Sequence, residues 1–157
     1  MPRGLYGRAA LILIVPIVTI QLVVSITFIQ RHFEKVTRQL TLGAIAELQL
    51  VQHELDREAS PARAQVRLAE LADALQMKAE LPVRRAGPTQ DMREFYDLSG
   101  RVVIATLRDG IVGLGPVDLV TDSDVNLRLP TRWGEMALQI ERNRFSASNP
   151  HQLLVLM

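Results

Sequence analysis

Residues 9–29 read AALILIVPIVTIQLVVSITFI and contain no charged side chain. At about 1.5 Å per residue, a helix of this length spans about 31 Å, which matches the roughly 30 Å hydrocarbon core of a bilayer. The run is longer than the apolar segment of a secretory signal peptide, and no small-residue cleavage site follows it. We therefore predict an uncleaved membrane helix over residues 9–29, preceded by a short N-terminal segment, residues 1–8.

The charged residues lie almost entirely beyond this helix. Residues 1–30 carry only Arg3 and Arg8, whereas the rest of the chain holds the other 16 of 18 Lys and Arg and all 17 Asp and Glu. This nearly neutral balance disfavours nucleic acid as a partner. The chain has no cysteine, which excludes disulfides, thiolate metal sites and cysteine nucleophiles. Basic residues flank the apolar run on both sides, so charge alone does not choose its orientation.

A helical pattern continues without a break beyond the apolar run. Apolar or small residues recur at steps of three or four, about 3.67 residues per turn, which is typical of straight or slightly right-handed helix pairing. The stripe is narrow and flanked by charges, so we predict a linking helix over residues 30–57 that pairs with a second copy. Packing of the same stripe on the chain's own domain is the alternative. The predicted dimer seam consists of Phe33, Val36, Leu40, Ala44, Leu48, Val51 and Leu55.

Residues 58–150 carry short mixed patterns that predict a small domain of helix and strand. Ser60 followed by Pro61 is typical of a helix N-terminus, and the amphipathic pattern then runs to Leu75. Residues 77–81 alternate between apolar and charged side chains, which predicts a strand. The fold class is therefore α+β, with a membrane helix continuing into a long dimerising helix and then a domain with a short antiparallel sheet.

The second half of this domain is less clear from its pattern. Residues 90–110 fit a helix, but β-branched residues and a Ser-Gly pair also fit a hairpin. We favour the helix, whose apolar stripe would comprise Met92, Phe95, Tyr96, Val103 and Leu107. Three strands are then predicted over residues 116–120, 125–129 and 135–140, with residues 129–134 as a hairpin connection.

The sequence offers little catalytic chemistry. His53-Glu54 begins like a zinc-protease motif, but Arg57 stands where the second histidine is required. The glycines of residues 110–115 lack the spacing of a phosphate-binding loop. Hard oxygen ligands for a divalent cation are weakly suggested by Asp118, Asp122 and Asp124, although a solvated loop is the favoured interpretation. We predict no catalytic and no cofactor-binding residue in this chain.

The last residues combine basic and apolar character. Arg142 and Arg144 are expected either to meet lipid phosphates or to close the last strand with solvent-facing charge. Residues 151–157, HQLLVLM, then read as the start of a second membrane helix, with a C-terminal strand as the alternative.

This order of elements resembles the N-terminal input region of bacterial two-component sensor histidine kinases, most closely the EnvZ-like osmolarity-sensor type. Residues 4–40, GLYGRAALILIVPIVTIQLVVSITFIQRHFEKVTRQL, are similar to the first membrane helix of that family. Residues 144–157, RFSASNPHQLLVLM, are similar to the approach to its second membrane helix. The resemblance implies a cytoplasmic N-terminus and a homodimer in the inner membrane. About residues 31–150 would face the periplasm, with residues 58–150 as a PAS-like sensor domain.

Kinases of this family continue through a complete second membrane helix, a HAMP linker, a phosphoacceptor-histidine helix and an ATP-binding domain, which this sequence lacks. ATP and Mg²⁺ are thus implied only for that kinase core, as is a response regulator partner. The chain itself is expected to transmit a periplasmic stimulus through paired membrane helices. An anchored periplasmic envelope or assembly protein, or the input region of a chemoreceptor or cyclase, has the same layout.

Overall fold

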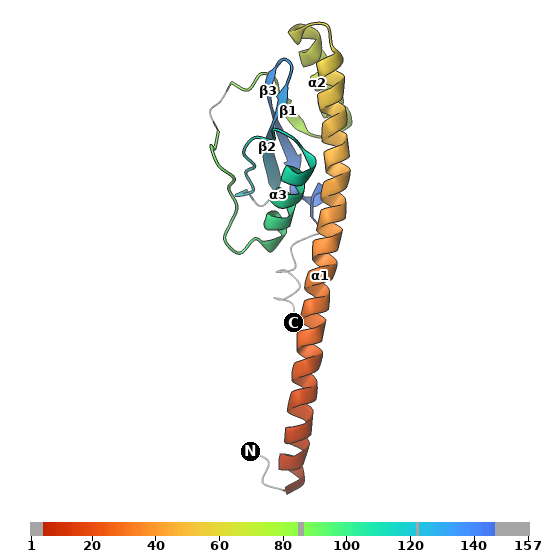
Figure 1. Ribbon diagram of the computed structural model, residues 1–157, viewed down its shortest axis with the longest axis vertical. Coiled ribbons are helices and arrows are strands. Elements are labelled where there is room, and N and C mark those ends of the chain that lie inside the picture. The colour runs from red at the N-terminus through yellow and green to blue at the C-terminus, as the bar shows by residue number, and fades with distance from the viewer. Residues whose placement is uncertain (1–4, 85–86, 122, 147–157) are drawn as a thin grey trace. The chain divides into compact units, whose positions relative to one another are not determined.

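The computed structural model describes residues 5–84, 87–121 and 123–146. Its elements follow in the order α1 (Leu5–Arg57), α2 (Pro61–Ala74), β1 (Lys78–Glu80), α3 (Leu98–Gly110), β2 (Asp124–Thr131), β3 (Gly134–Glu141) and the 3-10 helix η1 (Arg142–Arg144) (Figure 1). The chain divides into two compact units, Met1–Lys35 and Val36–Met157. The α+β class is confirmed, and the predicted linking helix is assigned in large part to the second unit.

The first unit contains the apolar part of α1. Among the described residues, α1 is the one helix long and apolar enough to cross a membrane, and its most apolar window has a mean hydropathy of 2.7 and no buried residue. Its threonines satisfy their hydroxyls within the helix, because Thr19 and Thr27 each donate to the carbonyl oxygen four residues earlier at 2.8 Å. Such internal satisfaction is what a helix surrounded by hydrocarbon requires.

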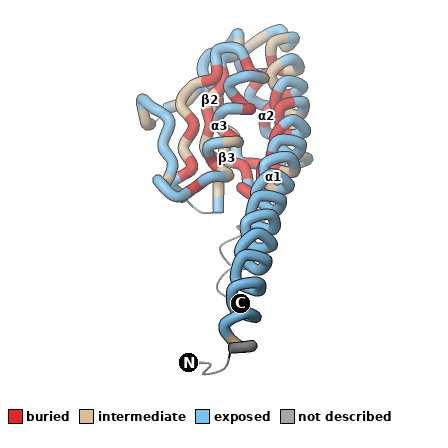
Figure 2. The backbone as a smooth tube through the Cα atoms, turned by 60° about the horizontal axis from the view of Figure 1, so that its bottom comes forward, coloured by how far each residue is buried: buried red, intermediate tan, exposed pale blue. Residues whose placement is uncertain are grey.

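The second unit is built on a three-stranded antiparallel sheet in the order β1-β3-β2. Burial alternates along β2 and β3, so one face of the sheet points into the core and the other is partly exposed. The inward face packs in one hydrophobic cluster with residues of α1, α2 and α3, seen as the red segments of Figure 2. That cluster includes Leu48, Val51, Leu55, Leu68, Val103, Leu107, Val125, Leu127, Leu129, Met136, Leu138 and Ile140.

Local signals set the helix ends in this unit. Ser60 caps α2, where its side chain accepts a hydrogen bond from the backbone N–H of Arg63 at 3.3 Å. Asp97 caps α3 in the same way through the N–H of Gly100 at 2.8 Å. Gly110 ends α3 at a close approach to α1, since a Cβ there would lie 2.7 Å from the Cδ1 atom of Ile45.

The helix favoured for residues 90–110 is confirmed only in its second half. Residues 98–110 form α3, so the hairpin interpretation is wrong, and Val103 and Leu107 are buried as predicted. The predicted start was wrong because Asp97 caps the helix seven residues further on. Met92, Phe95 and Tyr96 therefore lie outside it, and Phe95 is 95% exposed.

The strands were predicted with mixed success. The segments at 77–81, 125–129 and 135–140 are confirmed as β1, β2 and β3, and the connection between β2 and β3 is a tight turn between Thr131 and Gly134. The strand predicted over residues 116–120 is wrong. Only Asp118 makes isolated bridges there, to Met92 and to Asn126. Pro116, which lacks an N–H, cannot donate to a ladder at the start of that segment.

Candidate functional site

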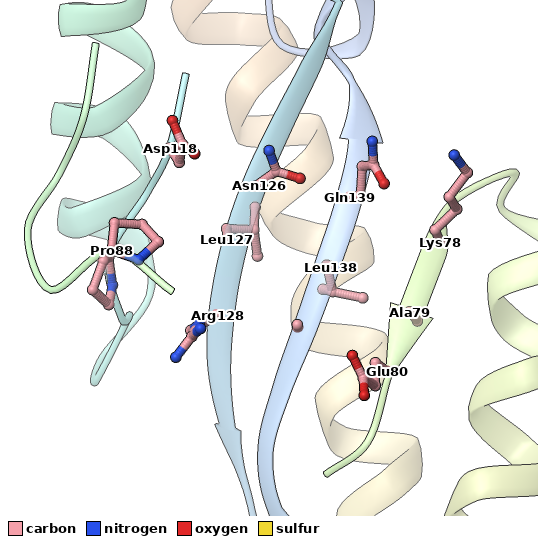
Figure 3. Close-up of a pocket in the computed structure, with 12 residues that line it drawn as sticks. Lys78, Ala79, Glu80, Pro88, Asp118, Asn126, Leu127, Arg128, Leu138 and Gln139 are labelled. Carbon is pink, nitrogen blue, oxygen red and sulfur yellow. The ribbon is translucent and has the colours of Figure 1, made fainter. Parts of the chain in front are cut away.

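The partly exposed face of the sheet carries a hollow of about 450 Å³. Figure 3 looks onto this face, with α1 behind the strands and the loop residue Pro88 on the side of β2. The floor comes from alternate residues of the three strands, whose neighbours Leu127 and Leu138 point into the core. The lining residues are Lys78, Ala79, Glu80, Pro88, Pro116, Asp118, Asn126, Leu127, Arg128, Ala137, Leu138 and Gln139.

Strand register arranges the polar side chains of this floor in two rows. Lys78 pairs with Gln139, Gln139 pairs with Asn126, and Asn126 bridges to Asp118, which places four polar residues across the sheet. The second row is Glu80, Ala137 and Arg128. Ala137 lies in its middle, and the small side chain of this residue leaves open space between two charged neighbours.

The floor carries balanced charge, part of which is unpaired. Arg128 forms an ion pair with Glu135 at 3.3 Å and is 20% exposed. The Oδ1 atom of Asp118 accepts from the N–H of Val120 at 3.0 Å. Among the described residues, Lys78 and Glu80 have no ion-pair or side-chain hydrogen-bond partner. Within the part of the chain that the structure describes, β1 thus presents to the hollow a lysine and a glutamate without a charged partner.

A second group of contacts ties the end of the sheet to α1. The Thr41 hydroxyl donates to the carbonyl oxygen of Phe145 at 3.1 Å, and Phe145 is fully buried. Arg144 forms an ion pair with Glu47 of α1 and also donates to the carbonyl oxygen of Leu75 at 2.7 Å. We call Thr41, Glu47, Arg144 and Phe145 the helix clamp, since they join residues that follow β3 directly to α1.

Arg142, next to the clamp, forms a buried ion pair with Asp97. Each side chain is 9% exposed, and Arg142 also donates to Ser99 at 3.3 Å and to the carbonyl oxygen of Leu119 at 3.4 Å. The pair connects the end of β3 to the first turn of α3. Burial tends to raise the pKa of Asp97, but hydrogen bonds from Gly100, Ser99 and Arg142 outweigh it and hold the pKa below its ordinary value.

Both arginines therefore differ from the expectation drawn from the sequence. Arg142 is buried and paired, so the prediction of lipid-facing or solvent-facing charge is wrong for it. Arg144 is half-buried and its guanidinium is bound to Glu47 and Leu75. The physical reason is that each arginine finds a carboxylate from a distant part of the chain, which no local pattern reveals.

The residues of the predicted dimer seam fall into a buried group and a more exposed group. Ala44, Leu48, Val51 and Leu55 are at most 7% exposed, because they pack in the core of their own chain. This matches the alternative in which the stripe packs on the chain's own domain. Phe33 and Val36 are half-buried, and Leu40 is 37% exposed. The four core residues are thus covered without a second copy.

The three weak metal candidates are not gathered into a site within the described part of the chain. Asp122 lies outside the described residues. Asp124 accepts from the Gln139 amide at 2.9 Å and from Ser123 at 3.1 Å, while Asp118 lies opposite Asn126. Across residues 5–84, 87–121 and 123–146, no three His, Cys, Asp or Glu side chains are placed to share a metal ion. The predicted start of a second membrane helix at residues 151–157 also falls outside the described residues.

Sequence reasoning missed the hollow and the Asp97–Arg142 pair. The Asp-x-x-Gly spacing of residues 97–100 was an available signal for the N-cap of α3, because an aspartate side chain accepts from a backbone N–H three residues later. The hollow had no such signal, since it depends on which residues of β1 and β3 stand opposite each other. Searches of the chain against protein-family models, curated proteins and solved structures gave no match.

Proposed function

We propose that this chain is the input region of a membrane-bound two-component sensor histidine kinase. In this proposal α1 anchors the protein in the bacterial inner membrane, and the unit from Val36 onward faces the periplasm as a PAS-like sensor domain. A kinase core outside this sequence would hold ATP and Mg²⁺ and pass phosphate to a response regulator. The support is the resemblance of residues 4–40 and 144–157 to that family, together with the apolar helix and the small α+β unit.

The observation that carries the proposal is the helix clamp. It fixes the residues after β3 to α1 through the Thr41–Phe145 hydrogen bond and the Glu47–Arg144 ion pair. A rearrangement of the sheet therefore acts on α1 and on the outgoing chain together. A two-state output needs states that differ by only a few kcal/mol. The buried Thr41 hydrogen bond and the part-exposed ion pair together contribute about 1–2 kcal/mol, which is enough to shift such an equilibrium.

The test is a chimera in which this chain is followed by a complete second membrane helix, a HAMP linker and a kinase core. Phosphotransfer is measured in membrane vesicles for the parent, for Arg144→Ala and for Arg63→Ala. Arg63 is exposed on α2, so its loss removes a charge without touching the clamp. We expect Arg144→Ala to change the basal ratio of kinase to phosphatase activity severalfold and Arg63→Ala to leave it unchanged. Equal output from all three folded chimeras would contradict the proposal and favour a passive membrane anchor.

A homodimer is part of this proposal, with its contact on the outward face of α1. Leu42 and Leu50 are 49% and 56% exposed, Ala46 is exposed between them, and a Cβ at Gly43 would meet no atom within 4 Å. Leu42→Cys and Leu50→Cys should crosslink two chains in vesicles, whereas Leu48→Cys should not. Crosslinking through Leu48→Cys alone would instead restore the seam predicted from the sequence.

A further inference from the structure

We propose that the hollow on the outer face of the sheet binds a small zwitterion with one ammonium and one carboxylate group, the chemistry of a free α-amino acid. As a binding site it stands on the geometry of the hollow alone. As the stimulus site of the input region it rests on the proposed function.

The first argument is the charge of the floor. Lys78 and Arg128 are positive and Glu80 and Asp118 are negative, so the lining has no net formal charge. A simple anion would meet two carboxylates there, and a simple cation would meet two basic groups. A ligand that carries both charges can place each of them against its opposite, so it avoids contacts between like charges.

The second argument is the position of the two unpaired charges. Lys78 and Glu80 are two residues apart on β1 and face the same side of the sheet. Their Cα atoms are therefore about 6.7 Å apart along the strand. They form no ion pair with each other. The ammonium and carboxylate of an α-amino acid are attached to one carbon atom. Lys78 points away from Glu80 in Figure 3, and its flexible side chain must turn toward the hollow for such a ligand to reach both groups.

The third argument is the neutral polar surface beside them. Asn126 and Gln139 are half-buried and lie next to each other in the row that begins with Lys78 (Figure 3). The Asn126 amide can both donate and accept, so it can serve either end of a zwitterion. Gln139 already donates to Asp124 at 2.9 Å, so its amide oxygen can accept from the ligand ammonium. The small side chain of Ala137 leaves space at the centre of the floor. The hollow, at about 450 Å³, is large enough for an amino acid with its own side chain.

The experiment is titration calorimetry on the full chain in lipid nanodiscs with each standard α-amino acid as the probe. Propionate and ethylammonium are the matched half-ligands, each carrying one of the two charges. We expect at least one amino acid to bind and both half-ligands to give no heat at the same concentration. Lys78→Gln and Glu80→Gln should each weaken that binding about tenfold, the effect of one charge-assisted hydrogen bond.

The control variants are Lys35→Gln and Glu34→Gln, which make the same two charge changes at exposed positions of α1. They should bind like the parent chain. The proposal is overturned if no amino acid binds at about 10 mM, if propionate binds as tightly as the amino acid, or if the two hollow variants bind like their controls. Binding without any change in the output of the chimera would contradict the proposed function and leave this site intact.

Discussion

Replacing Arg142 by methionine should destabilise the second unit by about 3–5 kcal/mol, the usual effect of removing one partner of a buried ion pair. The Asp97 carboxylate, only 9% exposed, would remain buried without its cation. Methionine fills much of the space of the arginine stem, so loss of packing contributes little. Since a domain of this size unfolds with a free energy of about 5–15 kcal/mol, the change removes a large share of the total.

The structure also predicts which second change relieves this loss. The N–H of Gly100 and the hydroxyl of Ser99 still bind Asp97 when Arg142 is gone. Asparagine at position 97 keeps an oxygen for the N–H of Gly100 but carries no charge. The double variant Arg142→Met/Asp97→Asn should therefore be more stable than Arg142→Met alone, with a coupling energy of about 1–3 kcal/mol.

The assay can use the single tryptophan of the chain. The indole N–H of Trp133 donates to the carbonyl oxygen of Leu55 at 2.8 Å, so its emission reports separation of the β2–β3 turn from α1. Urea unfolding in detergent micelles gives the free energy of unfolding for each variant. Arg101→Met, an exposed arginine on α3, is the matched control and should differ from the parent by less than about 0.5 kcal/mol. A loss below about 1 kcal/mol for Arg142→Met, or a double variant no better than the single one, would refute the reasoning.

Three further predictions concern other parts of the second unit. Leu48 is 1% exposed, so Leu48→Ala should lower the free energy of unfolding by about 2–5 kcal/mol in the same tryptophan assay. Leu42 lies on the outward face of α1, so Leu42→Ala should lower it by less than about 1 kcal/mol. Equal losses for the two variants would contradict the assignment of Leu48 to the core and Leu42 to the surface. Ser60→Ala removes the cap of α2 and should lower the free energy of unfolding by about 1 kcal/mol, which Ser60→Thr should largely restore. The hydrogen-bonded ion pair with Arg108 lowers the pKa of Asp91 in the folded chain. The stabilisation that this ion pair gives the folded chain is therefore complete above the ordinary aspartate pKa of about 3.9, and it is lost as the pH falls through the lowered pKa of Asp91. Unfolding curves of the parent chain and Asp91→Asn should thus differ at pH 7 and converge at low pH, and a constant difference would count against this ion pair.

Local patterns predicted the elements of this fold well. Three signals are each contained in one continuous stretch of the chain: the charge-free run, the Ser60-Pro61 pair and the turn before Gly134. The structure has a helix or a turn at each of them. Periodicity also identified the buried face of α1 around Leu48. It did not say what covers that face, because a stripe facing a second copy and a stripe facing the chain's own sheet have the same spacing.

Contacts between residues that are far apart in the chain could not be predicted from the sequence. Asp97 and Arg142 are 45 residues apart, and their pairing depends on how α3 packs beside the end of β3. The floor of the hollow depends equally on register, since a shift of one residue would turn Lys78 and Glu80 to the core side of the sheet. Which side chains line the hollow is therefore known only once the register of the three strands is known.

The helix clamp has a consequence for how this unit can be transferred between proteins. Thr41 and Phe145 are in hydrogen-bond contact although 104 residues separate them in the chain. The polypeptide therefore enters and leaves the sheet-bearing part of the unit at nearly one point of α1. Segments whose ends lie close together can be inserted into a host chain, or removed from it, with little strain on the flanking elements. The segment between these residues is thus a natural cassette for exchange, and a short turn is enough to close the gap that its removal leaves.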